Sequence, residues 1–317
     1  MKHHILLVEP MMKVIEDRLD EAYTVHRLYN PEEKQAIEAA LPSIRAVATG
    51  GATGLPREWF DRLPALGVIA VNGVGTDKVD LELARARNVH VTTTPDVLTE
   101  DVADMGIALM LALLRHIPQG DRMVREGRWA KREPFPLGTK VHGKRIGVLG
   151  LGQIGQALAR RAEAFGMAVR YWNRSLLDTA WVRHASPVEL AEDSDVLAVC
   201  VAANAATQGI VNAEVLAALG PTGFLVNVAR GSVVDEDALL AALKGGSIAG
   251  AGLDVFVDEP TIREEFFTAP NTVLMPHQGS ATVETRVTMG EIVLANIAAY
   301  FAGEKPPTSV NSQMDKP

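Results

Sequence analysis

The sequence contains little of what marks several classes of protein. Among its 317 residues there is one cysteine, Cys200, which rules out an intrachain disulfide and favours a reducing compartment. Positive charge is not in excess, because 31 Lys and Arg stand against 39 Asp and Glu for a net charge of −8. With no concentrated basic stretch, we expect no nucleic-acid partner.

Long hydrophobic runs and metal-binding patterns are also missing. The longest apolar helical stretch, residues 107–114, is too short to cross a bilayer, and no signal-peptide pattern is visible at the N-terminus. No cluster of Cys and His has the spacing of a zinc site. We therefore expect a cytoplasmic protein with no membrane partner and no metal.

What the sequence does contain is a regular alternation of short apolar runs and helical patterns, in two series. This alternation is typical of parallel α/β sheets, and the length suggests about two domains. Strands are predicted at residues 5–8, 23–28, 46–49, 68–71 and 89–92, and then at 145–149, 168–172, 196–201, 223–228, 248–253 and 272–275.

A glycine motif follows the first strand of the second series. Gly150, Gly152 and Gly155 read G-x-G-x-x-G between an apolar strand and an apolar helical segment. In such a motif the first glycine permits a tight turn, the second lets a pyrophosphate approach the backbone, and the third lets helix and strand pack closely. Since the helix N-terminus favours phosphate, the motif predicts a dinucleotide site.

The end of the next predicted strand indicates which dinucleotide is bound. Enzymes that use NAD usually place Asp or Glu there, about 20 residues after the motif, to bind the ribose hydroxyls. This chain has Asn173, Arg174 and Ser175 instead. Asn173 would not repel a 2′-phosphate, Arg174 offers a planar fork of donors, and Ser175 adds a hydroxyl. We predict NADP(H); the alternative is that Arg174 is an ordinary solvated cation.

Three later segments each place polar residues after a predicted strand. They carry Arg230, then the acids Asp254 and Glu259, and finally His277. Ligands of open α/β sheets lie beyond the carboxyl ends of the strands. An arginine, an acid and a histidine delivered there form a plausible set of reacting groups.

Taken together, these segments resemble the D-isomer-specific 2-hydroxyacid dehydrogenase family. The resemblance covers the chain from about residue 68 to about residue 300. The matching stretches are NGVGTDKVDL (72–81), TPDVLTEDVAD (94–104), GKRIGVLGLGQIGQALARRAEAFG (143–166), NVARGSVVDEDAL (227–239), GAGLDVFVDEP (250–260) and MPHQGSATVETR (275–286). TPDVLTEDVAD and GSATVETR are most similar to the glyoxylate/hydroxypyruvate reductase group, which includes enzymes like hydroxyphenylpyruvate reductase.

The resemblance implies a role for each matching residue. Arg230 would hold the carboxylate and keto oxygen of a 2-oxo acid, His277 would donate a proton to that oxygen, and Glu259 would orient the histidine. For the cofactor and the substrate carboxylate, the resemblance implies contacts from Gln153 and Ile154 to the pyrophosphate, from Asp254 to the nicotinamide, and from Val74 and Gly75 to the substrate.

The resemblance also implies an architecture of two Rossmann-like domains with parallel sheets and a cleft between them. A discontinuous substrate-binding domain would comprise residues 1–98 plus 285–317. Residues 99–284 would form the NADP-binding domain, with 120–140 as an arm of a homodimer.

The activity implied is NADPH-dependent reduction of small 2-oxo acids, such as glyoxylate and hydroxypyruvate, to D-2-hydroxy acids. Two alternatives stay open. One is a reductase of bulkier acids, such as phenylpyruvate or 2-ketogluconate, for which the Gly- and Ala-rich residues 50–54 could leave room. The other is a non-catalytic interaction protein that senses the dinucleotide.

Overall fold

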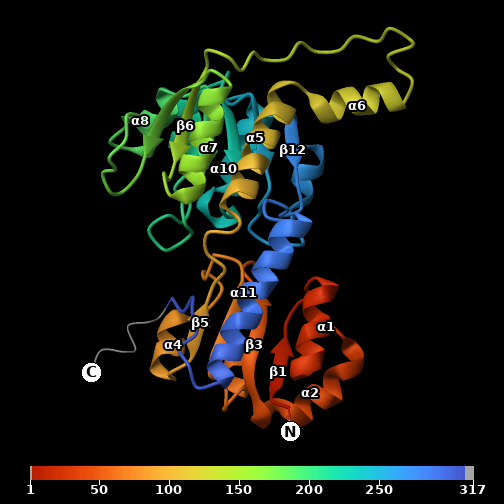
Figure 1. Ribbon diagram of the computed structural model, residues 1–317. Helices are drawn as coiled ribbons and strands as arrows, with labels where there is room; N and C mark the ends of the chain where they lie inside the picture. The colour runs from red at the N-terminus through yellow and green to blue at the C-terminus, as the bar shows by residue number, and fades with distance from the viewer. Residues whose placement is uncertain (1, 311–317) are drawn as a thin grey trace. The chain divides into compact units, whose positions relative to one another are not determined.

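The computed structural model describes residues 2–310 and divides into two compact units (Figure 1). Unit 1 comprises residues 1–98 and 281–317, and unit 2 comprises residues 99–280. The chain therefore leaves unit 1 once and returns to it. The return lies at Ala281, a few residues before the predicted position at 285, because Thr282 already caps the last helix by accepting from the Thr285 amide.

Unit 1 is built on a parallel sheet. Over the described residues its strand order is β2-β1-β3-β4-β5. The strands are β1 (His4–Leu7), β2 (Thr24–Arg27), β3 (Ile44–Gly50), β4 (Val68–Asn72) and β5 (His90–Thr92). The helices are α1 (Lys13–Ala22), α2 (Lys34–Ala40), α3 (Arg57–Arg62), α4 (Leu81–Ala86) and the C-terminal α11 (Val283–Phe301). The strands are the five that the sequence predicts, with small shifts at their ends.

Helix α11 packs on unit 1 although it follows unit 2 in the chain. It contacts β4 and α1, and its Val293 and Ile297 lie in one buried cluster with Ile15 of α1. At Gly290 a Cβ atom would lie only 2.4 Å from Ile15 Cγ1, so the two helices approach closely. Burial of this apolar face is what holds α11 to unit 1.

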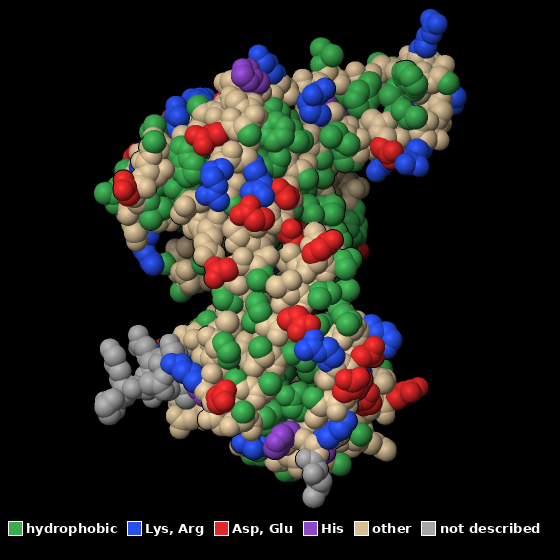
Figure 2. Space-filling model, viewed as in Figure 1, with side chains coloured by type: hydrophobic (Ala, Val, Ile, Leu, Met, Phe, Trp, Pro, Cys, Tyr) green, Lys and Arg blue, Asp and Glu red, His purple; other side chains and the backbone are tan. Residues whose placement is uncertain are grey.

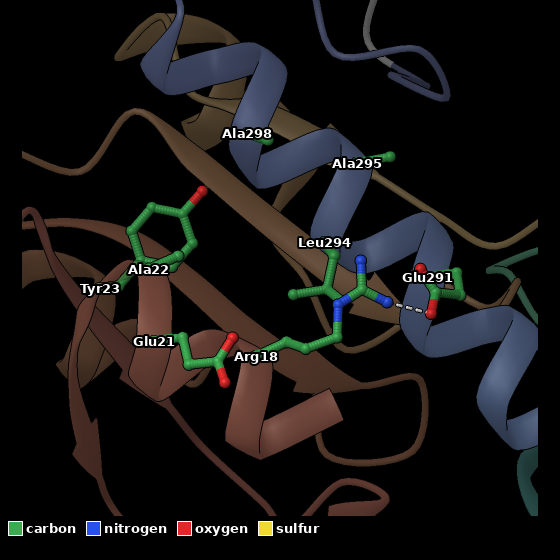
Figure 3. A pocket seen from close by; sticks show the side chains of 8 residues that line it. All are labelled: Arg18, Glu21, Ala22, Tyr23, Glu291, Leu294, Ala295 and Ala298. Atoms are coloured by element: carbon green, nitrogen blue, oxygen red, sulfur yellow. Dashed lines mark hydrogen bonds and ion pairs between the residues drawn. The ribbon is translucent and has the colours of Figure 1, made fainter. Parts of the chain in front are cut away.

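An open groove of about 440 Å³ lies between α1 and α11 (Figure 3). Alanines such as Ala295 and Ala298 line it, and Arg18 of α1 forms an ion pair with Glu291 of α11. The ion pair adds a second link between the two helices. The residues predicted to bind substrate or cofactor do not line this groove.

Unit 2 contains a longer parallel sheet. Over the described residues its strand order is β12-β11-β10-β9-β6-β7-β8. The strands are β6 (Arg145–Leu149), β7 (Ala168–Trp172), β8 (Val182–Arg183), β9 (Val196–Val199), β10 (Phe224–Asn227), β11 (Gly250–Leu253) and β12 (Thr272–Leu274). The order reverses between β6 and β9, and such a switch point is where open α/β sheets bind ligands.

The helices of unit 2 complete the predicted α/β pattern. They are α5 (Thr99–Leu114), α6 (Ile117–Arg125), α7 (Gln153–Ala164), α8 (Pro187–Glu192), α9 (Ala213–Leu219) and α10 (Glu236–Gly245). Helix α5 contacts α7, β10, β11 and β12, and most of its apolar residues are buried. Two units with parallel sheets thus confirm the predicted fold class. No helix within residues 2–310 combines the length and the apolar character that crossing a membrane requires.

Helix α6 and the extended segment that follows it project from the rest of unit 2 (Figure 1). This region exposes large apolar side chains among charged ones (Figure 2). Leu137 is 95% exposed and Trp129 is 70% exposed, and Ile117, Val124 and Phe135 are also exposed. Apolar side chains gathered in this way on one segment are typical of a contact surface.

Candidate functional site

The turn after β6 has the geometry that the glycine motif predicts. Gly150 has φ of +98°, which L side chains rarely adopt, and a Cβ there would lie 2.7 Å from the Val201 backbone. A Cβ at Gly155 would lie 2.1 Å from the Gly150 carbonyl oxygen. The turn and the close packing of α7 on β6 therefore both require glycine.

The space beside Gly152 fits a phosphate group. Gly152 is the N-cap of α7, and among the described residues no atom beyond its chain neighbours lies within 4 Å of the position that its Cβ would take. Gln153 and Ile154 form the first turn of this 12-residue helix, where the positive end of the helix dipole favours anions. The residues present thus fit the pyrophosphate of a dinucleotide, and they lie at the switch point of the sheet.

The loop after β7 carries the three residues predicted to select the cofactor. The Asn173 side-chain amide donates to the Ser175 carbonyl oxygen at 3.1 Å, so it braces the loop from within. Arg174 and Ser175 are exposed. Arg183 of β8 donates to the Asn173 carbonyl oxygen at 3.1 Å and brings a second guanidinium to this loop. Sequence reasoning missed Arg183 because β8 is only two residues long and carries no apolar run.

Arg230 follows β10 in a turn that Asn227 organises. The buried Asn227 side chain accepts from the Ala229 amide and donates to the Arg230 carbonyl oxygen, each at 3.0 Å. A Cβ at the next residue, Gly231, would lie 1.9 Å from the Phe256 backbone. Only glycine allows this approach, which brings the Arg230 turn beside the loop that carries Glu259.

His277 and Glu259 form the closest side-chain pair of the site. The distance between His277 Nδ1 and Glu259 Oε2 is 2.6 Å, and Glu259 Oε1 accepts from the Phe256 amide at 2.8 Å. Because a carboxylate only accepts, Nδ1 carries the proton, and Nε2 is the nitrogen that can exchange a proton with a substrate.

The electrostatic surroundings keep Glu259 ionised. Burial raises the pKa of Glu259, but the hydrogen bond and charge of His277, the Phe256 amide and the Arg230 charge together lower it below the ordinary value. Arg230 thus contributes to keeping the carboxyl ionised. The site therefore combines a cation, an ionised carboxylate and an oriented imidazole.

Asp254 lies at the same edge of the sheet and is 2% exposed. Its two carboxylate oxygens accept from the amides of Gln278 and Gly279, each at 2.7 Å. Burial raises the pKa of Asp254, and these two amides only partly offset it. The contacts made by Asp254 are thus to the loop of His277, and its predicted contact with the nicotinamide stays a prediction.

Sheet register explains why these residues meet. Asn227 pairs with Leu253, and Leu253 pairs with Leu274, so β10, β11 and β12 end side by side. The segments after the three strands carry Arg230, Asp254 with Glu259, and His277. Val74 and Gly75 lie in unit 1, in the loop that follows β4, where Val74 is exposed.

Comparisons with known proteins show the family of the chain. The family model described as "D-isomer specific 2-hydroxyacid dehydrogenase, NAD binding domain" matches residues 107–279. The 2-ketogluconate reductase of Gluconobacter oxydans (strain 621H) is 46% identical over 310 residues, which cover 98% of this chain and 99% of that protein.

Solved structures are similar over nearly the whole chain. A dehydrogenase from Rhizobium meliloti is 64% identical, with 96% of this chain and 100% of that chain covered and a TM-score of 0.78. The NADPH-dependent glyoxylate/hydroxypyruvate reductase of Sinorhizobium meliloti, in complex with NADP and malonate, is 42% identical, with 98% and 97% covered and a TM-score of 0.91. The resemblance inferred from the motifs is thereby confirmed.

Replacing Glu259 by Gln should flatten the pH dependence of stability. The ionised carboxylate, with its lowered pKa, stabilises the folded state above the ordinary Glu pKa of about 4.3, and this contribution is lost as pH falls through the lowered value. We expect Glu259→Gln to reduce the free energy of unfolding by about 1–3 kcal/mol at neutral pH and by less as the pH falls. Urea unfolding over this pH range measures the difference.

The neighbouring exposed acid provides the control. Asp258→Asn should change the free energy of unfolding little at any pH, because that side chain is exposed. A Glu259→Gln difference that stays constant down to about pH 3 would contradict a stabilising role for the charge.

Proposed function

The chain belongs to the D-isomer-specific 2-hydroxyacid dehydrogenase family, and we propose that it reduces small 2-oxo acids, glyoxylate and hydroxypyruvate, to D-2-hydroxy acids with NADPH. The observation that carries the proposal is the pair of His277 and Glu259, held at 2.6 Å on the sheet edge where the glycine turn also lies. An imidazole fixed by a carboxylate is suited to proton transfer rather than to binding alone.

The residues divide the work of the reaction between them. NADPH, when bound, supplies the hydride that C2 of the oxo acid receives. His277 donates its Nε2 proton to the carbonyl oxygen, and Glu259 stabilises the imidazolium before the transfer and keeps the ring oriented. The Arg230 guanidinium pairs with the substrate carboxylate and stabilises negative charge as it develops on the carbonyl oxygen.

Cofactor binding is assigned to the glycine turn and to the loop after β7. The open space beside Gly152 and the α7 N-terminus support pyrophosphate binding. For the 2′-phosphate, the uncharged Asn173 and the exposed Arg174 and Ser175 support NADP(H), the cofactor named for the Sinorhizobium reductase. A role for the Val74 and Gly75 amides in binding the substrate carboxylate is proposed from sequence resemblance alone.

A second candidate is a reductase of bulkier 2-oxo acids. It is favoured by the 2-ketogluconate reductase that shares 46% identity with this chain. A role limited to dinucleotide sensing would not need an imidazole held by a carboxylate, so the site favours catalysis.

A cytoplasmic location stays a prediction.

Replacement of His277 by Ala tests the proposed reaction. We expect kcat to fall by about 10²- to 10⁴-fold because the carbonyl oxygen loses its proton donor, while NADPH binding persists. The measurement is NADPH oxidation, followed by absorbance, with glyoxylate, hydroxypyruvate, phenylpyruvate and 2-ketogluconate in turn. His142→Ala, at an exposed position of unit 2, is the control.

The outcomes of this panel separate the candidates. Higher kcat/KM with glyoxylate and hydroxypyruvate than with the two larger acids supports the first proposal, and the reverse order supports the second. The assigned mechanism would be contradicted if the wild-type protein turned over none of the four acids. Near-normal turnover by His277→Ala would contradict it as well.

Replacing Asn173 by Asp should shift the cofactor preference toward NADH. The new carboxylate would repel a 2′-phosphate and could accept from ribose hydroxyls, and it could no longer donate to the Ser175 carbonyl oxygen. We expect the ratio of kcat/KM for NADPH to that for NADH to fall about tenfold or more, equivalent to about 1.4 kcal/mol. Asn173→Ser, which adds no charge, is the control, and an unchanged ratio in Asn173→Asp would refute the assignment.

We also propose that the protein is a homodimer that associates through the predicted arm at residues 120–140 together with the start of α6. The exposed apolar side chains of this region support it, because a monomer would leave them in water. Leu137→Glu should shift the sedimentation coefficient toward that of a monomer, since a charge would replace a contact. Leu176→Glu, 79% exposed in the wild type and outside the region, is the matched control. A Leu137→Glu protein that stays dimeric argues against this interface.

A further inference from the structure

His277 occupies an unusual backbone conformation. Its φ is +55°, in the left-handed region that residues other than glycine adopt only when their surroundings fix them. The direction of the Cα–Cβ bond depends on this backbone geometry. The turn therefore determines the direction in which the His277 side chain leaves the backbone. Whatever holds the turn also determines where the ring can reach.

Asp254 accepts from each backbone amide of the turn at residues 277–279. The main-chain oxygen of Asp254 accepts from the His277 amide at 2.9 Å, and its carboxylate oxygens accept from the amides of Gln278 and Gly279 at 2.7 Å. Three consecutive amides therefore end on Asp254. The Asp254 amide in turn donates to the Asn227 carbonyl oxygen at 3.0 Å, which ties the assembly to the end of β10.

The chemistry of a carboxylate suits this arrangement. An ionised carboxylate offers only acceptors, whereas a carboxamide would turn its NH₂ group toward one of the two amides. Charge-assisted hydrogen bonds to backbone N–H groups are short and strong, as the 2.7 Å distances indicate. A Cβ at Gly279 would lie 2.9 Å from Asp254 Oδ2, so the close contact also depends on glycine.

We propose that Asp254 is a positioning residue for the proton donor. Its carboxylate fixes the turn at residues 277–279 and so places the His277 side chain, while Glu259 fixes the ring at Nδ1. Both acids thus help to position the His277 imidazole. Asp254 acts through the backbone of the turn, and Glu259 acts through the ring. The inference rests on the proposed role of His277 as proton donor.

Asp254→Asn tests the proposal in the full-length protein. The substitution preserves the size of the side chain but replaces one acceptor by a donor facing an amide. We expect kcat to fall about 100-fold, because misplacement of a reacting group by about 1 Å has an effect of this size. The dissociation constant for NADPH, measured by fluorescence titration without substrate, should stay within about twofold of the wild-type value.

A loss of NADPH affinity equal to the loss of kcat/KM would show that Asp254 acts on the cofactor instead, and an unchanged kcat would exclude a positioning role. Asp258→Asn, at an exposed position four residues along the chain, is the control and should keep the wild-type kcat.

A double-mutant cycle separates positioning from a general effect on the fold. If Asp254 acts through His277, adding Asp254→Asn to His277→Ala should lower kcat little further. An additive loss in the double variant would overturn the Asp254 proposal while leaving the role of His277 intact. Near-normal turnover by His277→Ala would overturn both.

A second variant tests the same proposal if Asp254→Asn does not fold. Gly279→Ala leaves the carboxylate in place but sets a methyl group against Oδ2. We expect it to lower kcat with the NADPH dissociation constant unchanged. A Gly279→Ala protein with wild-type kcat would overturn the proposal.

Discussion

The site depends on three parallel strands that end side by side. Because β10, β11 and β12 are hydrogen-bonded in register, the segments that follow them emerge at one edge of the sheet. A guanidinium, two carboxylates and an imidazole are thereby collected from distant parts of the chain. Close backbone approach at Gly231 draws the first of these segments against the second. Without this packing, the same residues would be ordinary loop side chains.

Hydrogen bonds between side chains and the backbone then orient these residues. Asn227 shapes the turn of Arg230, the Phe256 amide holds Glu259, and Asp254 holds the turn of His277. The mild negative charge of the chain does not oppose anionic ligands here, because the cations and helix amides are local. The same principle operates at the glycine turn, where a Cβ at Gly152, the N-cap of α7, would meet no described atom beyond its chain neighbours.

Much of this could be predicted from the sequence because local constraints leave local patterns. A turn that requires glycine has glycine in the sequence, as at Gly150 and Gly155. Strands appear in the sequence as short apolar runs that alternate with helical patterns. Arg183 and the hydrogen bonds of the Asp254 carboxylate left no such pattern. Strand β8 is short and exposed, and the hydrogen-bond partners of the Asp254 carboxylate lie on a segment that follows a different strand.

The sequence by itself determined the fold class, the glycine turn after β6 and, through its motifs, the family. Its local signals, turn chemistry and strand periodicity, act over a few residues and so can be read along the chain. Only the tertiary structure decided that α11 packs against Ile15 of α1, that Glu259 binds His277 at Nδ1, and that Asp254 accepts from the amides of the turn. These contacts arise from sheet register and packing, which join residues that no local pattern connects.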